Sequence, residues 1–138
     1  MNKIEHIGIA VKNLESAGRI YESLLGVKSY KKEVVASESV MTEFFQTGES
    51  KVELLEATSA ESAIHKFIDK KGEGIHHIAF EVTDIIAEME RLQSEGFLLL
   101  SQQPKVGAGN KLVCFLHPKT TNSVLIEICQ AIAPIYDV

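Results

Sequence analysis

Residues 4–11 read IEHIGIAV and residues 75–82 read IHHIAFEV, and the two segments align without a gap. A short polar step follows each segment. Apolar residues at helical spacing come next and stop before Gly26 in the first case and before Gly96 in the second. Because a strand pattern and a helix pattern recur in the same order, we interpret the chain as an internal duplication.

Each half continues into three further strand patterns, so each half is predicted to have the order βαβββ. A helix at about 60–70 connects the halves, and no linker rich in Gly, Ser or Pro separates them. We therefore predict the α+β class and one domain over 1–138, with module one at about 1–58, a connecting helix at about 59–72 and module two at about 73–130. The predicted strands are 28–36, 39–46 and 50–56, then 97–101, 111–117 and 123–129.

Composition excludes several kinds of partner. Of the 138 residues 45% are hydrophobic, which indicates an ordered globular chain. The net charge is −5 and no basic block is present, so nucleic acid is not an expected partner. The apolar run near the N-terminus is short and contains a histidine, which is typical of neither a signal peptide nor a membrane span. We expect a cytoplasmic protein without a membrane partner.

Strand alternation separates the three histidines of the repeated segments. Successive side chains on a strand point to opposite faces. His6 shares its face with small residues, and so does His77, whose neighbour on that face is Ala79. His76 falls on the bulky apolar face, where a structural role is expected. The repeat independently aligns His6 with His77, so these two are the candidate ligands.

A carboxylate in the last strand of each half completes a repeated pair. Glu53 follows His6 at nearly the same separation at which Glu127 follows His77, while Glu56 is an alternative to Glu53. A buried carboxylate needs a partner or a metal. Two imidazoles and two carboxylates suit Zn²⁺, Co²⁺, Ni²⁺ or Mn²⁺. The competing interpretation is two core histidines and two solvent-facing edge glutamates.

Four segments carry a resemblance to the vicinal oxygen chelate superfamily and, within it, to the methylmalonyl-CoA epimerase family: IEHIGIAVKNLESA, ESKVELLEAT, GEGIHHIAFEV and FLHPKTTNSVLIEI. The resemblance implies two tandem βαβββ modules that form a cupped mixed sheet around a divalent metal. It also implies the ligand set His6, Glu53, His77 and Glu127, an acyl-CoA substrate and a homodimer.

The activity that the resemblance implies is interconversion of (2R)- and (2S)-methylmalonyl-CoA through a metal-stabilised enolate. Inversion requires acid/base groups on both sides of the substrate. Glu127 is the candidate on one side and Glu43 on the other. A gapless match places the glutamate of family members opposite Thr42, however, and a shift of one residue reverses the face. Either Thr42 or Glu43 therefore faces the metal.

Other functions share the expected fold. A glyoxalase I-type lactoylglutathione lyase can use the same two histidines and two glutamates. A non-catalytic small-molecule-binding protein of this fold commonly lacks them, and a ring-cleaving dioxygenase needs only one carboxylate. The loop at residues 107–110 is either a backbone cradle for substrate or an ordinary turn.

Overall fold

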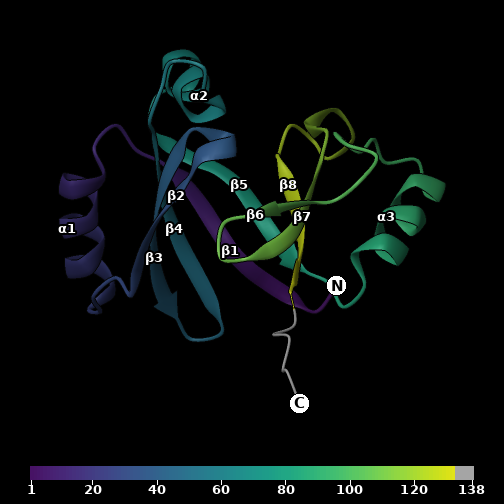
Figure 1. The fold of residues 1–138 in the computed structure, drawn as a ribbon, viewed down its shortest axis with the longest axis horizontal. Coiled ribbons are helices and arrows are strands. Elements are labelled where there is room, and N and C mark those ends of the chain that lie inside the picture. The colour runs from purple at the N-terminus through teal and green to yellow at the C-terminus, as the bar shows by residue number, and fades with distance from the viewer. Residues whose placement is uncertain (133–138) are drawn as a thin grey trace.

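The computed structural model describes residues 1–132, in which eight strands form one curved sheet with the order β2-β3-β4-β1-β5-β8-β7-β6 (Figure 1). The mixed strand directions and the helices outside the sheet confirm the predicted α+β class and cupped sheet. The strands are β1 (Lys3–Ala10), β2 (Lys31–Val35), β3 (Val40–Thr47), β4 (Ser50–Ala57), β5 (Gly74–Glu81), β6 (Lys105–Gly107), β7 (Lys111–Leu116) and β8 (Ile126–Ala131). The α-helices are α1 (Leu14–Leu25), α2 (Ala63–Lys71) and α3 (Ile85–Ser94), and single 3₁₀ turns occur at Ala36–Glu38 and Pro118–Thr120.

The duplication is visible in the strand pairing. In each half the first strand lies parallel to the last, β1 to β4 and β5 to β8. The halves meet through the antiparallel pair β1 and β5 at the centre of the sheet. The first and last strands of both halves therefore lie side by side at the centre of the cup.

The repeat extends to the helix ends. The Asn13 side chain caps α1 by accepting a hydrogen bond from the Ser16 backbone N–H at 2.9 Å. The Asp84 side chain caps α3 in the same way, accepting from the Ala87 N–H at 3.1 Å. Asn13 and Asp84 occupy equivalent positions when the two strand segments are aligned.

Each half has its own apolar core between its helix and the outer face of its strands. Figure 1 shows α1 and α3 on opposite flanks of the sheet and α2 at one rim. A buried aliphatic or aromatic side chain contributes about 1.5–3 kcal/mol relative to an exposed one, so these clusters hold the two arms of the cup in place. The cluster between α1 and the sheet consists of Val11, Leu14, Ala17, Phe45 and Leu54, and the cluster between α3 and the sheet consists of Val82, Ile85, Met89, Leu92, Cys114, Leu116 and Ile128.

The prediction of a strand at 97–101 is wrong. Within residues 1–132 this segment forms a single isolated bridge, Leu99 to Leu116, with two flanking backbone hydrogen bonds. The edge strand beside β7 is β6, later in the chain. Pro104 lies between the two segments. A proline has no N–H to donate to a neighbouring strand, so pairing along β7 is interrupted there and resumes at Lys105.

Two β-bulges distort the central pair of strands. The pairing of β1 with β5 passes from Ile4 directly to His6, which leaves Glu5 as an extra residue on β1. Further along, Gly8 pairs with His77 but Ile9 pairs with Ile75, which leaves His76 as an extra residue on β5. A bulge disturbs the alternation of side chains, and both bulges immediately precede a predicted ligand.

Within residues 1–132, no helix combines the length and the apolar content that crossing a membrane requires.

Candidate metal centre

Four predicted ligands converge on the inner face of the sheet. His6 comes from β1, Glu53 from β4, His77 from β5 and Glu127 from β8. Their exposed fractions are 4%, 4%, 5% and 5%, respectively. Four titratable side chains with so little contact with water need partners or a bound ion.

Small residues make room for these side chains. Gly8 pairs with both Glu53 and His77, and Ala79 pairs with both His6 and Glu127. A Cβ atom on Gly8 would lie only 2.2 Å from Cε1 of His77. The predicted small-residue face is therefore the face that carries the site.

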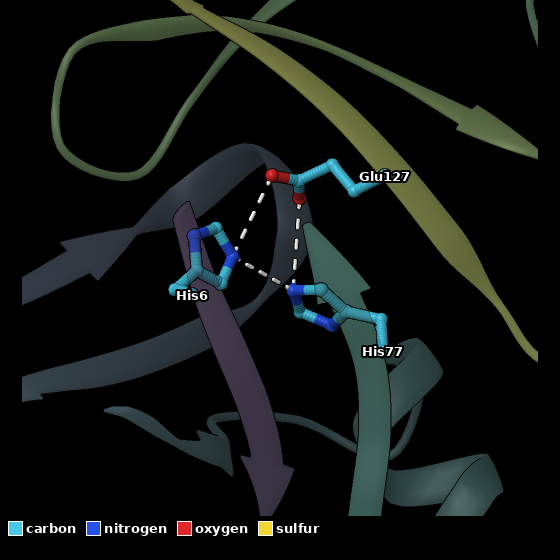
Figure 2. Close-up of side chains that lie close together, drawn as sticks. All are labelled: His6, His77 and Glu127. Carbon is cyan, nitrogen blue, oxygen red and sulfur yellow. Dashed lines mark hydrogen bonds and ion pairs between the residues drawn. The ribbon is translucent and has the colours of Figure 1, made fainter. Parts of the chain in front are cut away.

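Three of the four residues present ligand atoms to a common point (Figure 2). The Nε2 atoms of His6 and His77 lie 3.0 Å apart. Glu127 places Oε2 3.5 Å from Nε2 of His6 and Oε1 3.6 Å from Nε2 of His77. One atom from each residue lies within 4.8 Å of the others, which is compatible with a shared cation.

Glu53 contacts the opposite side of the His6 ring. Its Oε2 lies 3.0 Å from Nδ1 of His6, and it groups with Glu5 and His6 rather than with the other three residues. The structure thus brings all four predicted ligands into one buried cluster but places only His6, His77 and Glu127 around one point.

The side chain of Glu56, the alternative to Glu53 in the sequence, lies at the start of α1 and not at the site. Oε1 of Glu56 accepts a hydrogen bond from the Leu14 backbone N–H at 2.7 Å, at the start of α1. Gln130 does the same for Ile85 of α3 at 2.8 Å. Glu56 is therefore part of the helix-capping repeat, and Glu53 is the residue of the site.

The surroundings shift the pKa values of Glu127, His77 and His6 in different directions. Burial raises the pKa of Glu127 to about 7, and the neighbouring charge of Glu53 acts in the same direction. Burial and the proximity of His6 hold the pKa of His77 well below its usual range. For His6, burial alone would lower the pKa, but the hydrogen bond to Glu5 and the charges of Glu53 and Glu127 raise it.

These residues fit a divalent cation. A neutral His77 offers a lone pair, because only unprotonated imidazole binds metal. Oε2 of Glu127 is buried and has no hydrogen bond to any of residues 1–132. Carboxylate and imidazole are the donors that Zn²⁺ and similar ions prefer. A cation there would satisfy the unpartnered oxygen and counter the carboxylate charge.

The expectation that His76 faces the bulky apolar side is wrong. Because His76 is the extra residue of its bulge, its ring lies beside the His77 ring, with the two Nδ1 atoms 3.0 Å apart. The ring of Phe67 in α2 packs edge-on against it at 5.1 Å between centroids. His76 lines the same cavity as the candidate ligands.

The structure does not bring Glu43 to the site. Glu43 pairs with Leu54, whose side chain belongs to the core under α1, and its Oε2 accepts a hydrogen bond from Ser29 at 2.7 Å. Its neighbour Thr42 has the opposite orientation and lines the cavity. The Thr42 hydroxyl is fully buried and has no hydrogen-bond partner in the described part of the chain. The one-residue shift noted in the sequence therefore decides which side chain faces the site, and it is Thr42.

The site lies in an open cavity, whose empty volume with its mouth included is about 660 Å³. The inner strands form its floor. Its walls include residues 62–64, at the cap and first turn of α2, together with Gly107 at the end of β6 and Ala108 in the turn that follows. The glycine loop that the sequence singled out thus borders the site.

Sequence reasoning missed a buried cluster behind His6. Glu5 is 3% exposed, and its Oε1 lies 3.2 Å from Nδ1 of His6. Lys51 approaches Oε2 of Glu5 to 3.1 Å, and Lys111 approaches Oε1 to 2.8 Å. One feature of the sequence could have indicated this cluster, because Glu5 and His76 occupy equivalent positions in the repeat. Strand alternation alone, however, directs both side chains away from the site.

Comparisons with known proteins agree with this geometry. Residues 5–115 match the Glyoxalase/Bleomycin resistance protein/Dioxygenase superfamily. The chain is 38% identical to ethylmalonyl-CoA/methylmalonyl-CoA epimerase of Cereibacter sphaeroides, covering 94% of this chain and 98% of that protein. It is 39% identical to the uncharacterized protein YqjC of Bacillus subtilis, covering 94% and 93%.

A solved structure shows the same fold. A variant of Streptomyces coelicolor methylmalonyl-CoA epimerase in complex with 2-nitronate-propionyl-CoA superimposes with a TM-score of 0.90 at 32% identity, covering 96% of this chain and 99% of that one. Sequence and structure together show that this chain belongs to the Glyoxalase/Bleomycin resistance protein/Dioxygenase superfamily and, within it, to the methylmalonyl-CoA epimerase family of isomerases.

Proposed function

We propose that this protein interconverts (2R)- and (2S)-methylmalonyl-CoA, with a divalent cation held by His6, His77 and Glu127 and with Glu53 as a fourth ligand. The observation that carries the proposal is the buried trio whose ligand atoms face one another in the cavity. Near full-length similarity to epimerases supplies the substrate class. Co²⁺, Zn²⁺, Ni²⁺ and Mn²⁺ are all compatible with these donors.

A bound divalent cation supplies positive charge for the enolate oxygen that develops when the α-proton of the thioester leaves. Glu127 is the group that we assign to proton transfer on one side of the substrate. The assignment rests on position, because Glu127 is buried in the cavity and its carboxylate lies at the point shared with both histidines.

The other side of the substrate requires a second proton donor. Thr42 lies on β3, on the opposite arm of the sheet from β8, and it directs a buried, unpartnered hydroxyl to the cavity. A threonine hydroxyl does not ionise near neutral pH, so we assign it to holding a water that donates a proton to the enolate carbon. The hydroxide left behind takes up a proton from solvent through the open mouth of the cavity. Glu43 has no part in this mechanism, because its side chain lies under α1.

A glyoxalase I-type reaction is the second candidate, because the two imidazoles and two carboxylates suit both chemistries. A binding protein without catalysis is the third, and the four buried ligand-type side chains argue against it. The homodimer and the cytoplasmic location expected from the sequence belong to the same proposal, and sedimentation velocity tests the dimer.

The test is incubation of cobalt-loaded protein with (2S)-methylmalonyl-CoA, followed by separation of the two epimers. We expect conversion toward an equal mixture, loss of conversion with a chelator and recovery when Co²⁺ is returned. Conversion that is absent in the loaded protein, or undiminished after verified metal removal, contradicts the proposal.

A further inference from the structure

The two β-bulges occupy equivalent positions in the duplicated halves. Their extra residues are Glu5 and His76, and each immediately precedes its ligand histidine, His6 or His77. In a regular strand, a residue next to a ligand points to the opposite face. Here each bulge instead turns the residue before the histidine toward that histidine.

Both extra residues contact the same atom of their neighbour. Glu5 is hydrogen-bonded to Nδ1 of His6 at 3.2 Å, and His76 to Nδ1 of His77 at 3.0 Å. Oε2 of Glu53 also lies 3.0 Å from Nδ1 of His6, so that nitrogen faces two carboxylates. In both halves the opposite ring nitrogen, Nε2, faces the common point with Glu127. The two halves therefore orient their ligand histidines in the same way. The group that contacts Nδ1 is a carboxylate in the first half and an imidazole in the second.

We propose that Glu5 and His76 are matching positioning residues, which accept a hydrogen bond from the Nδ1–H of His6 and of His77 and thereby hold both Nε2 atoms toward the metal. The inference rests on the metal centre proposed above. A metal-bound histidine generally donates its second ring N–H to an acceptor, which fixes the ring and its tautomer.

Each acceptor is held beside its histidine. Glu5 is 3% exposed, and the His76 ring lies edge-on to the His77 ring within the cavity.

Packing fixes the two acceptors as well. Lys51 from β4 and Lys111 from β7 both bind the Glu5 carboxylate, so the cluster links the two halves behind His6. On the other side, the Phe67 ring packs against His76. Neither acceptor rotates away from its histidine without losing these contacts.

The decisive variants are a pair at His76, measured by calorimetric titration of the purified protein with Co²⁺ alone. His76→Phe keeps a ring against Phe67 but removes the acceptor nitrogen, so we expect a Kd for Co²⁺ that is about 10- to 100-fold weaker. His76→Asn returns an acceptor close to the position of Nδ1, so we expect most of the affinity to return. His65→Phe removes a half-buried imidazole of α2 that pairs with Asp69 at 3.2 Å and does not line the cavity. It serves as the matched control, with unchanged affinity.

Glu5→Gln tests the other half, with the exposed turn residue Glu49 changed to Gln as the control of equal charge. We expect a weaker Kd for Glu5→Gln, again by about 10-fold or more, and no change for Glu49→Gln. An affinity equal to wild type in His76→Phe overturns the role of His76, and the same result in Glu5→Gln overturns the role of Glu5. A loss in Glu5→Gln as complete as that in His77→Ala would make Glu5 a ligand and would also contradict the proposal.

Nitrogen NMR of the histidine rings shows which ring nitrogen carries the proton. It tests the proposal in the wild-type protein and does not depend on whether a variant folds. At about pH 9, we expect both His6 and His77 to carry their proton on Nδ1 in the zinc-loaded protein, with Nε2 free to bind the ion. A proton on Nε2 of either ring in the zinc-loaded protein overturns the assignment for that ring. Because neither measurement uses a substrate, absence of epimerase activity would refute the proposed function and leave this test intact.

Discussion

Gly8→Ala is the smallest change that tests the position of the His77 ring. An added Cβ on Gly8 would lie 2.2 Å from Cε1, 2.6 Å from Nδ1 and 2.8 Å from Nε2 of His77. Ordinary van der Waals contact begins at 3.4 Å, so the nearest ring atom must retreat by more than an ångström. The ring has little room, because His76 and Phe115 pack edge-on against it.

A shift of this size is large on the scale of metal coordination. Ligand distances in a metal site are held to about ±0.2 Å, and a misplacement of about 1 Å can cost about 100-fold in rate. We therefore expect Gly8→Ala to bind Co²⁺ at least about 100-fold more weakly than wild type and to lose epimerase activity to a similar extent. Titration with Co²⁺ measures the first quantity, and thermal unfolding followed by circular dichroism verifies that the variant is folded.

Gly18→Ala provides the matched control. Its added Cβ would also collide with a titratable side chain, at 2.4 Å from Oε1 of Glu43, but under α1 rather than in the cavity. We expect a change in thermal stability and no change in cobalt affinity. A folded Gly8→Ala protein with wild-type affinity would refute the assignment of His77 as a ligand.

Three further outcomes follow from the placement of single side chains. Glu43→Gln should leave the epimerisation rate and the metal content as in wild type, since Glu43 lies under α1; a rate reduced tenfold or more with full metal content would restore it as a catalytic candidate. Thr42→Val removes the hydroxyl that faces the cavity, so it should slow formation of the other epimer more than exchange of the α-proton with heavy water, and equal slowing of both would contradict the assignment of Thr42. Because the folded pKa of His76 is about 4 against 6.5 for a free histidine, the metal-free folded state binds a proton less readily than the unfolded chain. Stability is therefore full above pH 6.5 and falls as the pH drops toward 4, by up to about 3 kcal/mol from this residue. Urea unfolding across that range should show a weaker pH dependence in His76→Phe, and an identical dependence would refute the shift.

The duplication explains why much of the fold could be predicted from the sequence. Two matching segments identified β1 and β5, and alternation along them correctly placed His6 and His77 on the face with small residues. The position of Glu127 followed from the same rule applied to β8. These inferences depend only on local periodicity, which a single sequence contains.

The features that the sequence did not predict depend on pairing between distant segments. A bulge is a property of two strands together, so strand alternation placed His76 on the wrong face. The interruption at Pro104 depends on where the edge segment leaves β7. The choice between Thr42 and Glu43 required the register of β3 against β4, because one residue reverses the face.

The contacts of Glu5 with Lys51 and Lys111 join segments far apart in the chain. No local pattern indicates which lysines approach a given carboxylate. Tertiary geometry alone reveals that the residue before each histidine contacts its Nδ1 atom.

Exchange of the α-proton in heavy water tests the central claim most directly. Cobalt-loaded protein is mixed with a single epimer of methylmalonyl-CoA, and deuterium incorporation is followed by mass spectrometry while the epimers are separated. A glutathione hemithioacetal is assayed on the same sample. We predict deuterium at the α-carbon together with the opposite epimer, a requirement for the metal, and loss of both signals in Glu127→Gln. Absence of deuterium and of the second epimer, with turnover of the hemithioacetal, would contradict the assignment and identify a glyoxalase-type enzyme.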